Sequence, residues 1–532
     1  MGFNGFEFGA EGPLEKGSQS SFLVNYRYSM VATVQALGMN VGTGSATPYY
    51  QDACFKLHIV TKKSGTFDWF GLGGESHITF PPDSVNNFYV SNNGSLSNQV
   101  AKSLTGVTGV THTYFFDPNT SGKLTLAVSG IKTSYTEELI RESHPNQLSN
   151  VISNRQTKLS AGYTLNKKFS SRNQLTAGIL ADISFLNLNQ QYIPNGDSIL
   201  QTLIQTSKTT SLVKAFVNYA HRYSNIVSSN FGVYAQRLSL NGSWSIEPRW
   251  NLRYQFKPNQ SLSFGAGLHS QMQPLEVYFY QTPDATGQPQ LTNINLDFVR
   301  SIHTVAGYDI SLPNHIRIKT EIYGQYLFHA AVDNFSSSFS MLNYGADFGF
   351  PTNTNLVNKG TGYNYGLELT VEKFLYHGFY YLFTGSLFQS RYKGSDQVWR
   401  NTAFDSKAVA NFLAGKEFKI SNRSSFGLDT KLTVAGGQPF TPFDVSASQS
   451  AGYVIYKTNE AYSVYNNTYL RWDLKLSYTS NGRKATQKWY IDFQNMTNRK
   501  NIYIRTLNPS TGQIGEVYQM GFFPNINYQV TF

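Results

Sequence analysis

The sequence predicts an all-β protein, built as a transmembrane antiparallel up-and-down β-barrel. Apolar and polar residues alternate with a period of two from one end of the chain to the other. The alternating runs are roughly ten to fourteen residues long, which suits tilted strands that cross a bilayer. The connections between the runs switch regularly between tight and long, as they do in outer-membrane barrels.

The composition agrees with one large domain that spans residues 1–532. No Pro-rich, Ser-rich or charged linker divides the 532 residues, of which 15% are aromatic and 14% charged. The sequence contains no run of about 18 apolar residues, so no transmembrane helix is predicted. The negative mean hydropathy is compatible with strands that are apolar on one face only.

Charge and cysteine content exclude other classes. The net charge of +11 comes from basic residues scattered singly, without the clustered patch that nucleic-acid binding needs. The single cysteine, Cys54, permits no internal disulfide and is expected to be a small apolar residue on a strand. Residues 1–20 lack the charged and apolar regions of a secretory signal, so we expect the native N-terminus to lie upstream.

The alternation is clearest at 249–256, 316–328 and 470–478. In the second of these segments, Ile318 and Ile322 share one face and Arg317 and Lys319 share the other. One face suits lipid and the other suits water. A soluble sandwich also alternates, but its strands usually run only about five or six residues.

About twenty-one strands are expected on this reading. They lie at 2–10, 20–30, 53–61, 65–74, 108–117, 121–131, 157–166, 173–186, 211–222, 227–240, 243–256, 259–272, 296–311, 314–328, 361–374, 378–392, 405–420, 423–436, 467–480, 486–496 and 518–532. Tight connections such as 62–65, 119–122 and 257–260 alternate with long ones. The exception is a tight hairpin at Asn241 and Gly242, which falls on the long-loop side.

The expected number of strands is odd, and this suggests a further strand before the first one. If the short connections are periplasmic, the chain ends in the periplasm at Phe532 and begins outside at Met1. Bacterial single-chain barrels have an even number of strands. We therefore expect a twenty-second strand to precede residue 1.

Several segments are similar to a known family. They are GFEFGAEGP (5–13), NYRYS (25–29), EPR (247–249), GAGLHSQ (265–271), GYNYGLELT (362–370), LAGKEF (413–418), GGQPFTP (436–442), RWDLK (471–475) and DFQNMTN (492–498). Together and in this order they resemble the barrel of TonB-dependent outer-membrane receptors, in particular those of Bacteroidota. The chain departs from the family at its front, where the signal peptide, TonB-binding segment, plug domain and first of twenty-two strands are expected to be missing.

The resemblance implies energised uptake, across the cell outer membrane, of a scarce ligand too large for porins. A siderophore, a cobalamin-like cofactor, an oligosaccharide or a peptide all fit. The implied partners are outer-membrane lipid, the missing plug and through it the TonB complex, a possible surface lipoprotein, and the barrel-assembly machinery, which would read Tyr528, Val530 and Phe532. Two alternatives stay open, a plugless passive pore or structural barrel and a surface adhesin or glycan-binding barrel.

No enzyme, cofactor or metal site is expected. The sequence has no His-Glu-x-x-His, Gly-x-Ser-x-Gly or Walker motif. His269, His303, His315 and His329 are interpreted as ordinary rim or lumen residues.

The polar strand faces instead offer a set of charges expected to line the lumen. These are Arg27, Arg249, Arg253, Arg317, Lys319, Glu321, Glu368, Glu372, Arg471, Asp473 and Asp492. They form either a hydrated wall or, as the resemblance implies, a surface that pairs with the plug. The long loops at 31–52, 75–107, 132–156, 187–210, 273–295, 330–360 and 437–466 are rich in Asn, Ser, Gly and aromatic residues, which does not identify the ligand.

Overall fold

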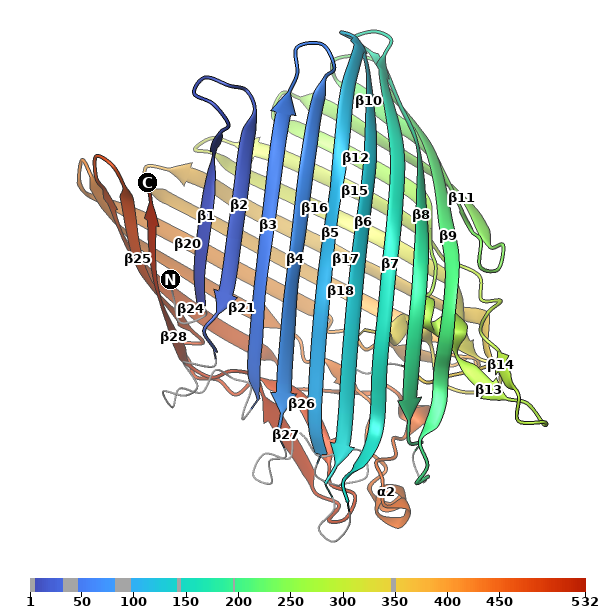
Figure 1. Ribbon diagram of the computed structural model, residues 1–532. Helices are drawn as coiled ribbons and strands as arrows, with labels where there is room; N and C mark the ends of the chain where they lie inside the picture. Colours follow the sequence, from blue (N-terminus) through green and yellow to red (C-terminus); the bar gives the residue numbers. More distant parts are fainter. Residues whose placement is uncertain (1–4, 32–45, 82–96, 141–144, 195–196, 346–350) are drawn as a thin grey trace.

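The computed structural model describes residues 5–31, 46–81, 97–140, 145–194, 197–345 and 351–532, and it shows a single large β-barrel (Figure 1). The strands are β1 (Gly5–Pro13), β2 (Ser21–Ser29), β3 (Thr47–Val60), β4 (Thr66–Phe80), β5 (Ser97–Asp117), β6 (Thr120–Leu139), β7 (Gln147–Lys168), β8 (Asn173–Tyr192), β9 (Gln201–Arg222), β10 (Val227–Leu238), β11 (Trp244–Lys257), β12 (Gln260–Gln271), β13 (Gln281–Pro283), β14 (Pro289–Leu291), β15 (Val299–Leu312), β16 (Ile316–Asp333), β17 (Leu356–Tyr376), β18 (Phe379–Lys393), β19 (Trp399–Asn401), β20 (Ala408–Ser421), β21 (Ser424–Ala435), β22 (Pro439–Phe440), β23 (Val464–Tyr465), β24 (Tyr469–Asn481), β25 (Thr486–Gln494), β26 (Ile502–Leu507), β27 (Ile514–Tyr518) and β28 (Phe523–Thr531). The helical turns are η2 (Leu275–Phe279), η3 (Met341–Asn343), α2 (Val445–Ala451) and η4 (Thr458–Glu460).

One antiparallel sheet of 22 strands forms the wall. Each long strand pairs with the next long strand along the chain, as an up-and-down barrel requires. The short strand β19 pairs with residues 391–393 of β18, and β20 pairs with residues 379–387 of β18. β19 and β20 therefore lie end to end beside β18 and count as one strand of the wall. Twenty-one strands therefore make the wall within the described chain, and the predicted fold class is confirmed.

The two ends of the sheet lie near each other (Figure 1). Within the described residues, β1 pairs only with β2 and β28 pairs only with β25. Glu7 of β1 nevertheless lies within electrostatic range of Tyr490 of β25. The seam between β1 and β28 thus separates two sheet edges whose backbone groups have no strand partner in the described part of the chain.

The two faces of the wall differ in chemistry. Trp69, Leu126, Ile179, Val217 and Ile322 are exposed on one face of their strands. The ion pairs Lys214–Asp182, Arg317–Glu372 and Lys319–Glu321 lie on the alternate positions of their strands. The apolar face is the outer surface of a membrane barrel, because only apolar side chains suit contact with lipid. The charged face therefore lines the interior.

The two rims of the barrel also differ. Tight turns join the strands at one rim, for example at 61–65 and 118–119, and long connections lie at the other. The Asn241–Gly242 turn is tight as predicted: the Gly242 amide donates to the Leu238 carbonyl at 3.0 Å, and Gly242 adopts a φ of 76°. By the rule for outer-membrane barrels, the tight rim is periplasmic and the loop rim extracellular.

The predicted strand ends are wrong on the loop side of β3 to β9 and of β16 and β17. These strands extend into the segments 31–52, 75–107, 132–156, 187–210 and 330–360 that were expected to be loops. The strand expected at 518–532 begins only at Phe523. The β26–β27 hairpin and the short pairs β13–β14 and β22–β23 were also not predicted. Part of each of the predicted loops at 31–52, 75–107, 132–156, 187–210 and 330–360, and the start of the predicted strand at 2–10, lie outside the described residues.

The described residues contain no helix that is long and apolar enough to span a membrane.

Candidate functional site

The connection from β12 to β15, residues 272–298, folds inward against the barrel wall; we call it loop A. Its side chains Tyr278, Phe279, Tyr280 and Phe298 are almost fully buried. They belong to the hydrophobic cluster of the loop rim, whose other members include Leu186, Leu188, Leu203, Ile204, Leu238, Leu296, Met341 and Leu356. Leu186 and Leu188 alternate along β8 with the same phase as the interior residue Asp182, so the cluster lies inside the barrel mouth.

Polar contacts fix loop A to the wall. The Asn241 side-chain amide donates to the carbonyls of Ile294 at 3.0 Å and Leu296 at 2.8 Å. The Gln281 amide donates to the Gln205 carbonyl at 3.1 Å, and the Gln156 amide donates to Glu276. Strands β7, β9 and the β10–β11 turn thus all hold loop A.

Further connections continue this packing around the mouth. Loop B (residues 334–355, described at 334–345 and 351–355) joins loop A where the Asn355 amide donates to Thr292 Oγ1 at 3.0 Å. Loop C (394–407) joins loop B where the Ala403 amide donates to Asn343 Oδ1 at 2.9 Å. Loop D (436–468) joins loop C where the Tyr465 hydroxyl donates to Asp405 at 3.0 Å.

The last connection in this series is loop E (495–522). The Arg505 guanidinium lies 4.7 Å from the centre of the Phe440 ring of loop D. Loops A to E therefore form one connected structure over the mouth between β12 and β28.

A buried glutamate supports the wall beside loop A. Glu247 of β11 is 1% exposed and forms an ion pair with Arg249 at 2.6 Å. Its carboxylate also accepts hydrogen bonds from Gln236 at 3.1 Å, Ser245 at 3.0 Å and Ser270 at 2.5 Å. A buried carboxylate is stable only when paired and hydrogen-bonded in this way. The Glu247-Pro248-Arg249 segment thus connects three adjacent strands.

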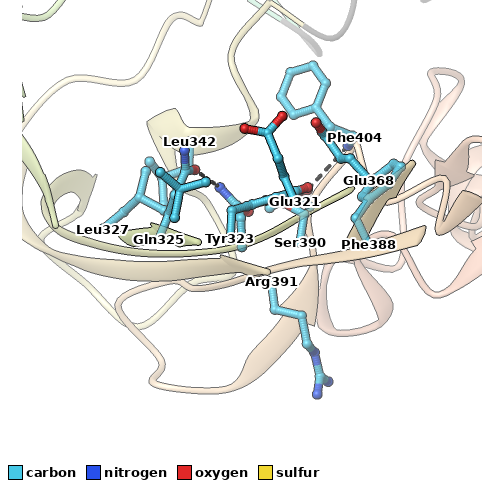
Figure 2. A pocket seen from close by; sticks show the side chains of 13 residues that line it. Glu321, Tyr323, Gln325, Leu327, Leu342, Glu368, Phe388, Ser390, Arg391 and Phe404 are labelled. Atoms are coloured by element: carbon cyan, nitrogen blue, oxygen red, sulfur yellow. Dashed lines mark hydrogen bonds between the residues drawn. The ribbon is translucent and has the colours of Figure 1, made fainter. Parts of the chain in front are cut away.

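A pocket of about 540 Å³ lies on the interior wall formed by β15 to β18, below loops B and C (Figure 2). Its polar lining includes Glu321, Tyr323, Gln325, Asn364, Glu368, Ser390 and Thr402, and its apolar lining includes Leu327, Leu342, Phe388 and Phe404. In Figure 2 the Glu321 carboxylate and the Phe404 ring rise on one side of the sheet, whereas Arg391 points to the other.

The two carboxylates of the pocket are close. Glu321 and Glu368 lie directly opposite each other on β16 and β17. Glu321 pairs with Lys319 at 2.6 Å, whereas Glu368 has no ion pair among the residues described. The Asn364 amide donates to Gln325 at 2.9 Å, and the Thr402 hydroxyl donates to Ser390 at 2.7 Å. Carboxylates, amides and hydroxyls beside two phenyl rings suit a ligand with several hydrogen-bond donors and an apolar face.

Eight of the eleven predicted interior charges form ion pairs within the barrel itself. The pairs are Arg27 with Asp52, Arg249 with Glu247, Arg317 with Asp309 and Glu372, Lys319 with Glu321, and Arg471 with Asp473. Arg253, Glu368 and Asp492 have no ion pair in the described part of the chain, although Gln494 donates to Asp492 at 3.0 Å. A role of these charges in binding another domain stays a prediction.

The remaining residues singled out from the sequence have ordinary surroundings. The His269 and His303 rings lie 4.4 Å apart, and His315 and His329 contact Tyr376 and Phe328. Cys54 is a free, half-buried thiol. Among the described residues, no three His, Cys, Asp or Glu side chains gather at metal-binding distances.

Three titratable groups of loop A have shifted pKa values. Burial raises the pKa of the Tyr278 hydroxyl to about 12 and also raises the pKa of the Tyr280 hydroxyl. At the β13–β14 turn, hydrogen bonds from Thr286, Gln288 and Gln290 lower the pKa of Asp284 to about 2. Tyr278 is therefore neutral and Asp284 ionised at neutral pH.

Comparison with known proteins supports this fold. No protein-family model and no curated protein sequence matches the chain. Among solved structures it is similar to BauA, the ferric preacinetobactin receptor from Acinetobacter baumannii (TM-score 0.65, 10% identity, covering 99% of this chain and 78% of that one). The ferric yersiniabactin uptake receptor FyuA from Yersinia pestis gives a TM-score of 0.65 at 12% identity, covering 99% and 77%. The ferric-catecholate import receptor Fiu from E. coli K12 gives 0.66 at 10% identity, covering 99% and 81%. The fold is that of the large barrels of receptors that import ferric siderophores.

Sequence reasoning missed the inward course of loop A. The signal was present, because Leu275-Glu276-Val277-Tyr278-Phe279-Tyr280 is an apolar run inside a segment read as an exposed loop. Such a run needs an apolar partner. Its partners, Leu186, Leu188 and Ile204, could be identified only once the strands were placed.

Proposed function

We propose that this chain is the membrane barrel of a TonB-dependent receptor of the Bacteroidota type. It would import a scarce ligand too large for porins across the outer membrane and would have no enzymatic role. The observation that carries the proposal is the loop end, where loops A to E form one structure over the interior pocket of β15 to β18. A passive pore needs no such covered binding surface.

The similar solved structures support the same proposal, since BauA, FyuA and Fiu are receptors for ferric siderophores. A siderophore, a cobalamin-like cofactor and an oligosaccharide all satisfy the polar and aromatic lining of the pocket.

The proposal includes a separate plug domain inside the barrel. Arg253, Glu368 and Asp492 provide interior charges without ion pairs in the described residues, and the unpaired edges of β1 and β28 would accept one further strand. A TonB complex would act on the receptor through this plug.

Two partner assignments complete the proposal. Tyr528 and Val530 share the outer face of β28, and the ring centres of Tyr528 and Trp489 lie 5.3 Å apart. Together with Phe532, these two residues would form the signal that the barrel-assembly machinery reads. A surface lipoprotein would bind at the loop rim.

The test is a growth comparison in the native host between deletion of this gene and inactivation of TonB. The probes are ferric siderophores under iron chelation, cyanocobalamin as the only cobalamin, and single oligosaccharides as the carbon source. We expect one condition in which neither strain grows. In that condition the intact gene should restore growth to the deletion strain. A growth defect that does not depend on TonB would instead support a passive pore, and a defect confined to surface attachment would support an adhesin.

A further inference from the structure

The outer surface of the barrel carries a row of basic side chains across four adjacent strands. The row consists of His77 on β4, Lys102 on β5, Lys132 on β6 and Arg155 on β7. Residues an even number of positions apart on a strand share one face. His77 shares the face of Trp69, Lys102 that of Leu104, Lys132 that of Leu126 and Arg155 that of Leu159, and these apolar side chains are exposed on the lipid-facing surface. All four therefore point outward, away from the interior.

The strand register brings these side chains together. Lys132 lies directly opposite Arg155, and His77 lies directly opposite Lys102. Lys132 is also opposite Leu104, which places Lys102 on the diagonal from Lys132. Like charges directly opposite on a sheet repel each other. The row therefore needs an anionic partner to offset this repulsion.

The barrel does not supply that partner within the residues described. Lys102, Lys132 and Arg155 are exposed and form no ion pair there. The nearest outward acid is Glu75, which lies opposite Leu104 and accepts a hydrogen bond from Gln51. At most one carboxylate thus adjoins three permanent positive charges.

The row lies at the extracellular margin of the apolar belt. On the periplasmic side of Lys132, β6 presents Val128, Leu126 and Leu124 to lipid. On its loop side, β6 presents Ser134 and Thr136. This is the depth at which lipid headgroups of the outer leaflet meet a barrel wall.

A strip without side chains runs directly below the row. Gly73, Gly106 and Gly130 are aligned across β4, β5 and β6 on the outer face. None has a positive φ, and a Cβ at any of them would meet its nearest atom at 3.6 to 3.7 Å. Neither backbone conformation nor packing requires glycine, although glycine weakens a strand interior. The strip leaves space for a flat group to lie against the backbone.

We propose that this surface binds a phosphate-bearing glycolipid of the outer leaflet. Lys102, Lys132 and Arg155 hold its phosphate groups through charge-assisted hydrogen bonds, with His77 at the end of the row. The sugar lies over the glycine strip, and the acyl chains follow Leu104 and Leu159 toward the periplasmic side. The charge and depth of the row select a lipid headgroup over a soluble anion. The proposal is independent of the transported ligand.

The experiment measures binding of purified lipopolysaccharide to the full chain in phosphatidylcholine nanodiscs, with native and dephosphorylated lipopolysaccharide compared. The test variant is Lys132→Gln with Arg155→Gln. The matched control is Lys62→Gln with Lys63→Gln, which removes two exposed charges from the opposite rim. We expect the test variant and the dephosphorylated probe each to bind about tenfold more weakly, and the control to bind normally.

A second variant separates the strip from the charges. Gly130→Val fills the strip, should fold because the Cβ site is open, and should also weaken binding. Heat-dependent migration on gels verifies that every variant has formed a barrel. Unchanged affinity of the charge variant, equal affinity for the dephosphorylated probe, or displacement of lipopolysaccharide by millimolar inorganic phosphate would each overturn the proposal.

Discussion

At the scale of single residues, the interior of the barrel is organised by charges that satisfy one another. Arg317 illustrates this, since its guanidinium reaches both Asp309 on the neighbouring strand and Glu372 on the other side. The alternation of the sequence was enough to place Arg317 and Glu372 on the polar face. It could not reveal the partner Asp309, because the register between β15 and β16 sets which side chains meet.

Glu247 provides the sharpest residue-scale prediction. Replacing it by alanine leaves Gln236, Ser245 and Ser270 without their shared acceptor and Arg249 without its ion pair. We expect the free energy of unfolding in detergent micelles to fall by about 3 kcal/mol. Glu15→Ala, at an exposed turn position, is the control and should change it by less than about 0.5 kcal/mol. Equal stability of the two variants would show that the buried network is not structural.

Tyr278 gives a prediction about alkaline pH. Its folded pKa of about 12 lies above the ordinary value of about 10, so the folded form keeps the proton more tightly. The stabilisation is complete below about pH 10 and is lost as the pH rises through 12. The tyrosinate absorbance of Tyr278→Phe should be subtracted from that of the wild type at each pH, because the other tyrosines contribute to both proteins. The difference should appear as the pH rises toward 12, whereas a difference that appears at pH 10 would contradict the burial of this hydroxyl.

At the scale of elements, sequence patterning identified the strands where they cross lipid and failed where they leave it. The loop-side part of β8 has Asn187 and Asn189 on the outer face, and Leu186 and Leu188 buried on the inner face. Alternation continues there with its phase reversed, so the pattern of an apolar outer face no longer marks the strand, which stays paired with β7. The core of loop A was missed for a related reason, since its partners are distant in sequence.

Phe298 tests whether loop A is held by its core. Phe298→Ala should create a cavity among Leu238, Tyr278 and their neighbours and lower the free energy of opening loop A by about 3 kcal/mol. Limited proteolysis in micelles should then cleave loop A faster, while the barrel stays intact. Phe335→Ala, which removes an exposed ring from loop B, should leave cleavage unchanged. Similar cleavage of both variants would argue against a packed loop A.

At the scale of the whole molecule, two features decide how the barrel closes: the seam between β1 and β28, and the plug that we propose within the lumen. The odd strand number follows from loop alternation, and the described wall has the same number of strands. The 532-residue chain in planar bilayers should therefore either fail to close or conduct as a wide, open pore. A small conductance gated by an added ligand would contradict this.

Single-cysteine labelling in intact cells tests the central claim, an outer-membrane barrel whose loop rim faces outward. In a Cys54→Ser background, Ser446→Cys in α2 and Ser64→Cys in the β3–β4 turn are treated with a membrane-impermeant maleimide. The account predicts labelling at position 446 in intact cells and at position 64 only after the outer membrane is permeabilised. The reverse pattern, or equal labelling of both positions in intact cells, would contradict it.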